Sequence, residues 1–248
     1  MIPIQASLPL SALPIVVVLG LIFGSFVTAL SYRLPRGQSI AKGRSACPSC
    51  GTTLTPKDLV PVFSWLMHGG KCGHCGARVS WRYPAIEILT ALLFAVAALA
   101  VADTARLVLV LAATPVMMAL AIIDVEHRRL PNSLLAILAI LFAAHRAAGD
   151  GDYVTAAIAC VVVFASAVAF DAAGRRFIRQ GLSMGDAKLM AAAALALPPI
   201  PLLTALGVAG VLGAAVAVLP WMRNHRPGNH FAFGPALLLA FWGAIITL

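Results

Sequence analysis

The stretch RLVLVLAATPVMMALAIID, residues 106–124, decides the fold, because it is almost entirely apolar and ends in an aspartate. At the helical rise of about 1.5 Å per residue, residues 106–123 form a helix about 27 Å long, which is enough for the hydrocarbon core of a bilayer. A carboxylate at the edge of such a span is costly and needs a reason. A second stretch, GLSMGDAKLMAA at 181–192, places Asp186 directly before an alanine-rich span. The sequence thus offers Asp124 and Asp186 as candidates for one shared site.

The composition extends this interpretation to the whole chain. Its 248 residues are 61% hydrophobic and 11% charged, with a mean hydropathy of +0.95. A soluble domain of this size has no surface for so much apolar material, so we predict an all-α polytopic membrane protein. The apolar stretches lack the alternation of barrel strands. The net charge of +9 is explained by short basic loops that set orientation, and nucleic-acid binding is not expected.

Hydropathy predicts about eight transmembrane helices and also their orientation. With the loop after the first span in the cytoplasm, 16 of the 18 basic residues lie inside, and only Arg106 and Arg146 lie outside. This bias predicts that both termini are outside and that Asp124 and Asp186 are at the cytoplasmic face. Residues 1–12 carry no positive region, so no cleaved signal peptide is expected. The predicted spans are 13–31, 84–102, 106–123, 133–149, 153–173, 187–199, 201–220 and 231–248.

A small polar insert, residues 32–83, separates the first two spans and carries two cysteine pairs. Cys47 and Cys50 form one C-x-x-C pair and Cys72 and Cys75 the other, with 21 residues between the pairs. This spacing indicates a structural zinc ion held by four thiolates; redox thiols or disulfides are the alternative, which a cytoplasmic loop disfavours. So small an insert needs such a staple to fold. The predicted organisation is a first helix (1–31), the zinc loop (32–83) and a membrane core (84–248).

Each aspartate also has an ordinary explanation. Asp124 could simply end a helix with mixed charge, and Asp186 could cap the start of the next one. Gly185 directly before Asp186 allows a close approach of the backbone, and Lys188 follows two residues later. We therefore expect Gly185 and Lys188 to support a site built on the two carboxylates.

The chain resembles the type IV prepilin peptidases, which are membrane aspartyl proteases of the GxGD type. The shared motifs lie in the same order from residue 20 to residue 240. They are Gly24-Ser25-Phe26, Tyr32-Arg33-Leu34-Pro35, the two cysteine pairs, Pro61-Val62-Phe63-Ser64-Trp65-Leu66, Arg82-Tyr83-Pro84-Ala85-Ile86-Glu87, Asp124 with Leu130-Pro131, Gly185-Asp186-Ala187-Lys188-Leu189 and Phe233-Gly234-Pro235. The chain departs from the family pattern at Thr28, Gly73 and Ser183, where Asn, a basic residue and Gly are usual.

The resemblance implies an endopeptidase of the bacterial inner membrane that removes the cytoplasmic leader of prepilins or pseudopilins after a Gly. Asp124 and Asp186 would be its catalytic residues. It also implies N-methylation of the new N-terminus with S-adenosylmethionine, although the residues themselves show no strand–glycine turn–helix unit for a methyl donor. Membrane lipid is the expected surrounding. The sequence indicates neither the pilin system nor the oligomeric state.

Three alternatives remain from the sequence. The chain could be a peptidase without methyltransferase activity, a zinc-bearing membrane adaptor, or a proton-coupled transporter. A transporter needs a polar track to the outer side, but the acidic residues predicted outside are Asp103, Asp150 and Asp152, all in short loops. The acidic residues therefore favour the peptidase.

Overall fold

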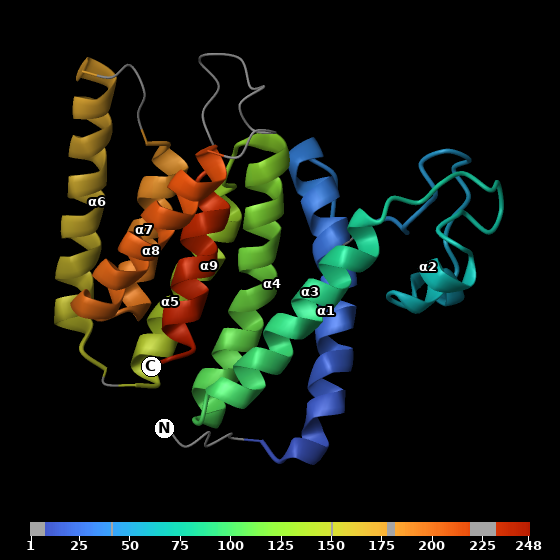
Figure 1. Ribbon diagram of the computed structural model, residues 1–248, viewed down its shortest axis with the longest axis horizontal. Helices are drawn as coiled ribbons and strands as arrows, with labels where there is room; N and C mark the ends of the chain where they lie inside the picture. Colours follow the sequence, from blue (N-terminus) through green and yellow to red (C-terminus); the bar gives the residue numbers. More distant parts are fainter. Residues whose placement is uncertain (1–7, 41, 150, 178–181, 219–231) are drawn as a thin grey trace. The chain divides into compact units, whose positions relative to one another are not determined.

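The computed structural model describes residues 8–40, 42–149, 151–177, 182–218 and 232–248, and within these ranges the chain is helical (Figure 1). Asp150 and the loop ends of the last two predicted spans lie outside the described residues. The helices are α1 (Leu13–Arg33), α2 (Phe63–Met67), α3 (Arg82–Ala100), α4 (Thr104–His127), α5 (Asn132–Ala147), α6 (Tyr153–Phe177), α7 (Met184–Ala196), α8 (Pro199–Val218) and α9 (Gly234–Ile245), with short 3-10 helices at Leu10–Ala12, Leu34–Arg36 and Pro56–Leu59.

The all-α membrane architecture predicted from the sequence is confirmed. Within the described ranges, 4 helices are long and apolar enough to cross a bilayer, namely Leu10–Arg36, Arg82–Ala100, Thr104–His127 and Tyr153–Gly174. The apolar helices Asn132–Ala147, Pro199–Ala215 and Gly234–Ile245 are shorter. The predicted number of eight spans is therefore not confirmed, because hydropathy finds apolar segments whether or not they have full spanning length.

The chain divides into two compact units, Met1–Ala102 and Asp103–Leu248. In the first unit, α1 packs along α3. A Cβ atom added at Gly20 would lie 2.6 Å from the Cα of Ala91, and one at Gly24 would lie 2.6 Å from the Cα of Glu87. Only glycine permits these contacts, so two small residues on α1 let the helix backbones meet as they do in many membrane helix pairs.

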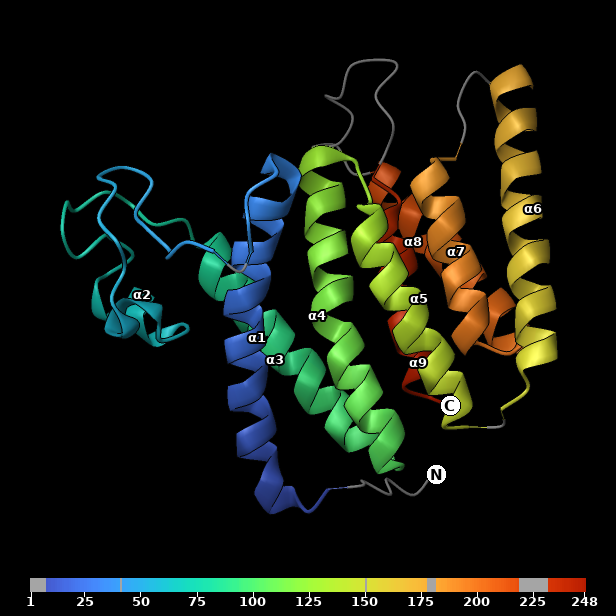
Figure 2. The ribbon, with the colours of Figure 1, turned by 180° about the vertical axis from the view of Figure 1, so that it is seen from behind.

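The second unit is built around α7, the alanine-rich helix that follows Ser183. This helix packs against α5, α6, α8 and α9, while α4 packs against α5 and α9 (Figure 2). Alanine side chains such as Ala193 and Ala194 are buried and let the surrounding helices approach closely. The unit thereby places α7, which begins with Asp186 in its first turn, among four other helices.

A buried hydrogen bond joins α9 to α4 near the middle of α4. The indole Nε1 of Trp242 donates to the hydroxyl of Thr114 at 2.9 Å. The same hydroxyl donates to the carbonyl of Val110 at 2.7 Å, next to Pro115, which lies inside the helix. Apolar surroundings make an unpaired polar group costly, so these two linked hydrogen bonds hold α9 against α4. They thereby also fix the position of the first residues of α9.

Candidate active site and metal centre

Asp124 lies in the last turn of α4, and its side chain is 6% exposed. The helix ends because Arg128 takes a left-handed conformation with φ 53° and donates its N–H to the carbonyl of Asp124 at 2.8 Å. Leu130 and Pro131 then turn the chain into α5. The aspartate therefore sits where a buried helix stops and the chain reverses.

Asp186 lies in the first turn of α7 and is 5% exposed. The N-cap residue of this helix is Ser183, whose hydroxyl accepts the N–H of Asp186 at 3.1 Å. The Asp186 carboxyl in turn accepts hydrogen bonds from the side chain and the backbone of Ser183. The serine that departs from the family pattern thus takes the capping role. Among the described residues, Oδ1 of Asp186 is buried and has no hydrogen-bond partner. This oxygen is left available for something other than holding the helix.

The two carboxyl groups are close enough to interact electrostatically. The start of α7 lies close against the turn that follows Asp124: a Cβ atom added at Gly185 would lie 3.0 Å from the Cβ of Leu130. Two buried carboxyls at short range do not both ionise easily, so such a pair tends to hold one proton between them. That state supplies a base and an acid at the same place.

Two further contacts surround the pair. The backbone N–H of Gly234, at the start of α9, donates to Oδ2 of Asp124 at 3.0 Å. On the exposed side, the ammonium of Lys188 donates to the side-chain oxygen of Asn132 at 2.9 Å, which ties the first turn of α7 to the first turn of α5. Lys188, two residues after Asp186, therefore joins α7 to α5, the helix that follows the Asp124 turn.

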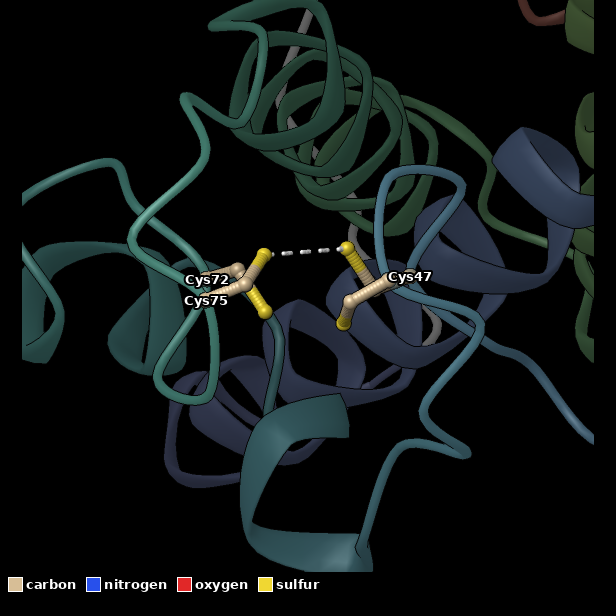
Figure 3. Close-up of side chains that lie close together, drawn as sticks. Cys47, Cys72 and Cys75 are labelled. Atoms are coloured by element: carbon tan, nitrogen blue, oxygen red, sulfur yellow. Dashed lines mark hydrogen bonds between the residues drawn. The ribbon is translucent and has the colours of Figure 1, made fainter.

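The insert brings its two cysteine pairs together (Figure 3). The Sγ atoms of Cys47, Cys50, Cys72 and Cys75 all lie within 4.8 Å of one another, and Cys47 and Cys75 are 4.0 Å apart. A tetrahedral zinc ion with bonds of about 2.3 Å needs sulfur atoms about 3.8 Å apart, so the four sulfurs fit the ion. The five cysteines of the chain are free thiols, so the disulfide alternative is not what the structure contains.

Each cysteine pair lies on a tight turn. Gly51 (φ 72°) and Gly76 (φ 70°) adopt left-handed conformations and donate their N–H groups to the carbonyls of Cys47 and Cys72. The turns direct amides at the sulfurs: those of Cys50 and Ser49 lower the pKa of the Cys47 thiol. Lowered thiol pKa values favour the thiolate that a metal needs.

The other thiols follow the same pattern with one exception. The hydroxyl and amide of Thr52 lower the pKa of Cys50, and the amides of Cys75 and His74 lower that of Cys72. At Cys75 the amide of Ala77 acts in the same direction, but the neighbouring thiols and burial outweigh it and raise the pKa to about 11. Three thiolates crowding a fourth thiol produce this behaviour, and a cation among them would relieve it.

Two family models match the chain. The model of the bacterial peptidase A24 N-terminal domain matches residues 18–101, and that of the type IV leader peptidase family matches residues 111–218. A "Prepilin leader peptidase/N-methyltransferase" of Bacillus subtilis is 34% identical over 228 residues, which cover 91% of this chain and 90% of the relative. The chain belongs to the type IV leader peptidase family. It is therefore an enzyme, of the prepilin peptidase class.

Other members of the family show the same extent of similarity. A protein of the same description from Neisseria gonorrhoeae is 30% identical over 264 residues, which cover 93% of this chain and 89% of the relative. The "Type 4 prepilin-like proteins leader peptide-processing enzyme" of Escherichia coli is 30% identical over 262 residues, which cover 96% of this chain and 94% of the relative. No solved structure matches the chain significantly.

Sequence reasoning missed two contacts that the structure of this family member reveals. The amide of Gly234 lies beyond the residues matched by the peptidase model. Its sequence signal is the shared motif Phe233-Gly234-Pro235, which carries no charged group to mark a contact with Asp124. In the N-terminal unit, the buried carboxylate of Glu87 accepts the N–H of Val62 at 2.7 Å and a hydrogen bond from the Ser25 hydroxyl. The signal for Glu87 was an acidic residue inside an apolar span.

Val62 has an unusual backbone. Its φ of 60° and ψ of −48° describe a γ-turn, which is closed by the N–H of Phe63 donating to the carbonyl of Pro61. A β-branched residue rarely adopts this conformation, and the strain costs about 1–3 kcal/mol. The hydrogen bond to Glu87 holds the turn in place and attaches the insert to α3.

Proposed function

We propose that Asp124 and Asp186 are the catalytic pair of a membrane aspartyl endopeptidase. The observation that carries the proposal is that two carboxyl groups, 62 residues apart in the sequence, are both buried and lie within electrostatic range in one unit. Burial of a single aspartate has many structural explanations. Burial of two within electrostatic range of each other is costly for folding and is typical of a proton-sharing catalytic pair.

In the proposed reaction, the ionised carboxylate takes a proton from a water molecule as the water attacks the scissile carbonyl carbon. The protonated carboxyl donates a hydrogen bond to the carbonyl oxygen and so stabilises the tetrahedral intermediate. The intermediate then breaks at the C–N bond, and the amine leaves with a proton from the pair. Lys188 supports this site through its hydrogen bond to Asn132 on α5, and Gly185 supports it by allowing α7 to lie close to Leu130.

The substrates we propose are prepilins or pseudopilins, whose single apolar helix enters the membrane while a basic leader remains in the cytoplasm. Cleavage follows a Gly at that boundary. Support comes from the family and from the relatives' names. The basic residues of the chain favour a site at the cytoplasmic face of the bacterial inner membrane.

The relatives' names also include N-methyltransferase activity, and we propose that this chain likewise methylates the new N-terminus with S-adenosylmethionine. A zinc ion on the four cysteine thiolates would hold the insert in its folded state and would complete a closed coordination shell, as structural zinc does. The insert would then contribute to methylation rather than to cleavage.

The test of the peptidase is cleavage of a prepilin by the purified full-length protein in detergent, read by mass spectrometry. Asp124→Asn and Asp186→Asn should each reduce the rate by at least about 100-fold, because each removes a proton-transfer group. Asp103→Asn is a matched control: Asp103 lies before the first residue of the same helix α4, where its carboxylate accepts the N–H of Arg106 at 2.8 Å, and an asparagine also caps helices. Normal cleavage by either active-site variant would reject the assignment.

A further inference from the structure

The start of α9 provides an unexpected hydrogen-bond donor to the carboxyl pair. Gly234 is the first residue of the helix and Pro235, which has no N–H, is the second. The amide of Gly234 therefore belongs to the helix N-terminus, where backbone N–H groups have no partner within the helix and the dipole is positive. This amide donates to Oδ2 of Asp124 at 3.0 Å, in a buried position.

A side chain at position 234 would occupy the space of the Asp124 carboxyl. A Cβ atom added at Gly234 would lie 2.7 Å from Oδ2, 3.1 Å from Cγ and 3.3 Å from Cβ of Asp124. Any side chain would push the carboxylate away from the amide. Gly243 lies on the same helix, and a Cβ atom there would meet nothing within 4 Å. The demand for glycine is thus local to the contact with Asp124.

The two carboxyls are treated differently by their surroundings. Asp124 accepts a hydrogen bond on Oδ2 from a helix N-terminus, and this stabilises a negative charge there. In the described part of the chain, the buried Oδ1 of Asp186 receives no donor. Ser183 supplies hydrogen bonds to the Asp186 carboxyl, but they leave this buried Oδ1 without one, and an oxygen that lacks a donor is the better place for the shared proton.

We propose that Gly234 is a positioning residue that fixes the Asp124 carboxylate as the base and thereby leaves the proton on Asp186. This proposal rests on the peptidase function proposed above and adds which aspartate takes the proton from water. In the reaction, Oδ1 of Asp124, the oxygen not held by Gly234, receives that proton. Asp186 gives its own proton to the substrate, and after the amine has left, transfer of the proton from Asp124 to Asp186 restores the starting state for the next turnover.

The test begins with stability, which does not depend on any substrate. Gly234→Ala should lower the Tm of the full-length protein in detergent, because the new methyl group meets Oδ2 of Asp124. In the Asp124→Ala background the same substitution should have no such effect, since the carboxylate is gone. Gly243→Ala should leave Tm unchanged in both backgrounds. An equal loss in both backgrounds would show that Gly234 does not act on Asp124 and would overturn the proposal.

Kinetics with prepilin then test the role of the contact. Gly234→Ala should lower kcat by about 100-fold with little change in KM, because a misplaced base weakens the transition state and not substrate binding. Gly243→Ala should cleave normally. A normal kcat for Gly234→Ala, or a rise in KM alone, would overturn the positioning role. If the single variant fails to accumulate, the Asp124→Ala double variant should restore accumulation, and lack of restoration would overturn the contact.

These results separate the proposal from the peptidase function. If Asp124→Asn cleaves normally, the peptidase assignment fails, whatever the Tm values show. If both aspartate variants are inactive while Gly234→Ala cleaves normally, the peptidase stands and only the role of Gly234 fails.

Discussion

The two units of the molecule each bury a carboxylate and each hold it with a backbone amide from a distant segment. In the first unit Glu87 accepts the N–H of Val62 at 2.7 Å, and in the second Asp124 accepts the N–H of Gly234 at 3.0 Å. Both side chains are 6% exposed. The two arrangements therefore start from the same physical problem, a charged group removed from water.

The two carboxylates differ in the other groups that surround them. The partners of Glu87 are neutral donors, and the amide that reaches it belongs to a strained turn. Asp124 has a second carboxyl nearby, whose Oδ1 has no partner among the described residues. A carboxylate whose hydrogen bonds come from neutral donors joins two segments of the fold, whereas a carboxylate close to another carboxyl group can exchange protons with it. Burial alone does not mark a catalytic group.

The largest expected effect is on peptide cleavage, where the two buried carboxylates should behave differently. Asp124→Asn should reduce prepilin cleavage by at least about 100-fold, whereas Glu87→Gln should leave cleavage close to that of the unchanged protein, because glutamine keeps an oxygen that accepts the N–H of Val62. Initial rates measured by gel or mass spectrometry at one substrate concentration are sufficient. Comparable losses in the two variants would mean that Glu87 also takes part in the chemistry.

The next effect concerns the insert that Glu87 fastens. Replacing Cys72 and Cys75 with Ser should release zinc, measured by elemental analysis, and should make residues 42–81 sensitive to protease, because the insert has too little core to fold alone. Cleavage of prepilin should fall only partly and methylation much further. Mass spectrometry of one incubation with S-adenosylmethionine reads both. Full retention of zinc would remove the metal site, and equal loss of both activities would assign the insert to the fold as a whole.

A smaller effect is expected from Glu87 itself. Glu87→Ala leaves the N–H of Val62 and the hydroxyl of Ser25 without their acceptor, and should lower the free energy of unfolding by about 1–3 kcal/mol. Thermal unfolding in detergent measures the change, with Glu87→Gln as the matched variant that should lose less. Equal losses for Ala and Gln would show that the hydrogen bond to Val62 contributes little.

The smallest effect tests the cap of α7. Ser183→Ala removes the acceptor for the N–H of Asp186 and should cost about 1 kcal/mol of stability, while Ser183→Gly should cost only a few tenths. Both variants keep the Asp186 carboxyl, so cleavage should change little. A large loss of cleavage in Ser183→Gly, the residue usual in the family, would show that the serine does more than cap the helix.

The sequence predicted those features that depend on local composition. Apolar length located every long helix within a few residues, and the cysteine spacing predicted the cluster that the structure forms. The number of spanning helices was not predictable in the same way, because α5, α8 and α9 are apolar but short. Hydropathy measures composition, and only the folded helix boundaries give the length.

The contacts that sequence reasoning could not find are made by backbone atoms. The bond from Gly234 to Asp124 joins residues 110 positions apart, and the donor is an amide that every residue except proline possesses. The γ-turn at Val62 is likewise invisible, since valine rarely takes that conformation and nothing in its side chain suggests it. Charged and sulfur-bearing side chains mark a site in sequence, but the groups that orient them need not.

The shortness of α7 bears on how the reaction obtains its water. This helix has 13 residues and so measures about 20 Å, while the hydrocarbon core of a bilayer is about 30 Å thick. Asp186 lies in its first turn, so the carboxyl stands at the end of a helix that covers only about two thirds of the apolar layer. The side chains of α7 are largely buried among α5, α6, α8 and α9, so protein and not lipid surrounds this helix. Each hydrolysis consumes one water molecule, and we expect a helix that stops short of the membrane surface to leave water a short route to Asp186 without a channel across the bilayer.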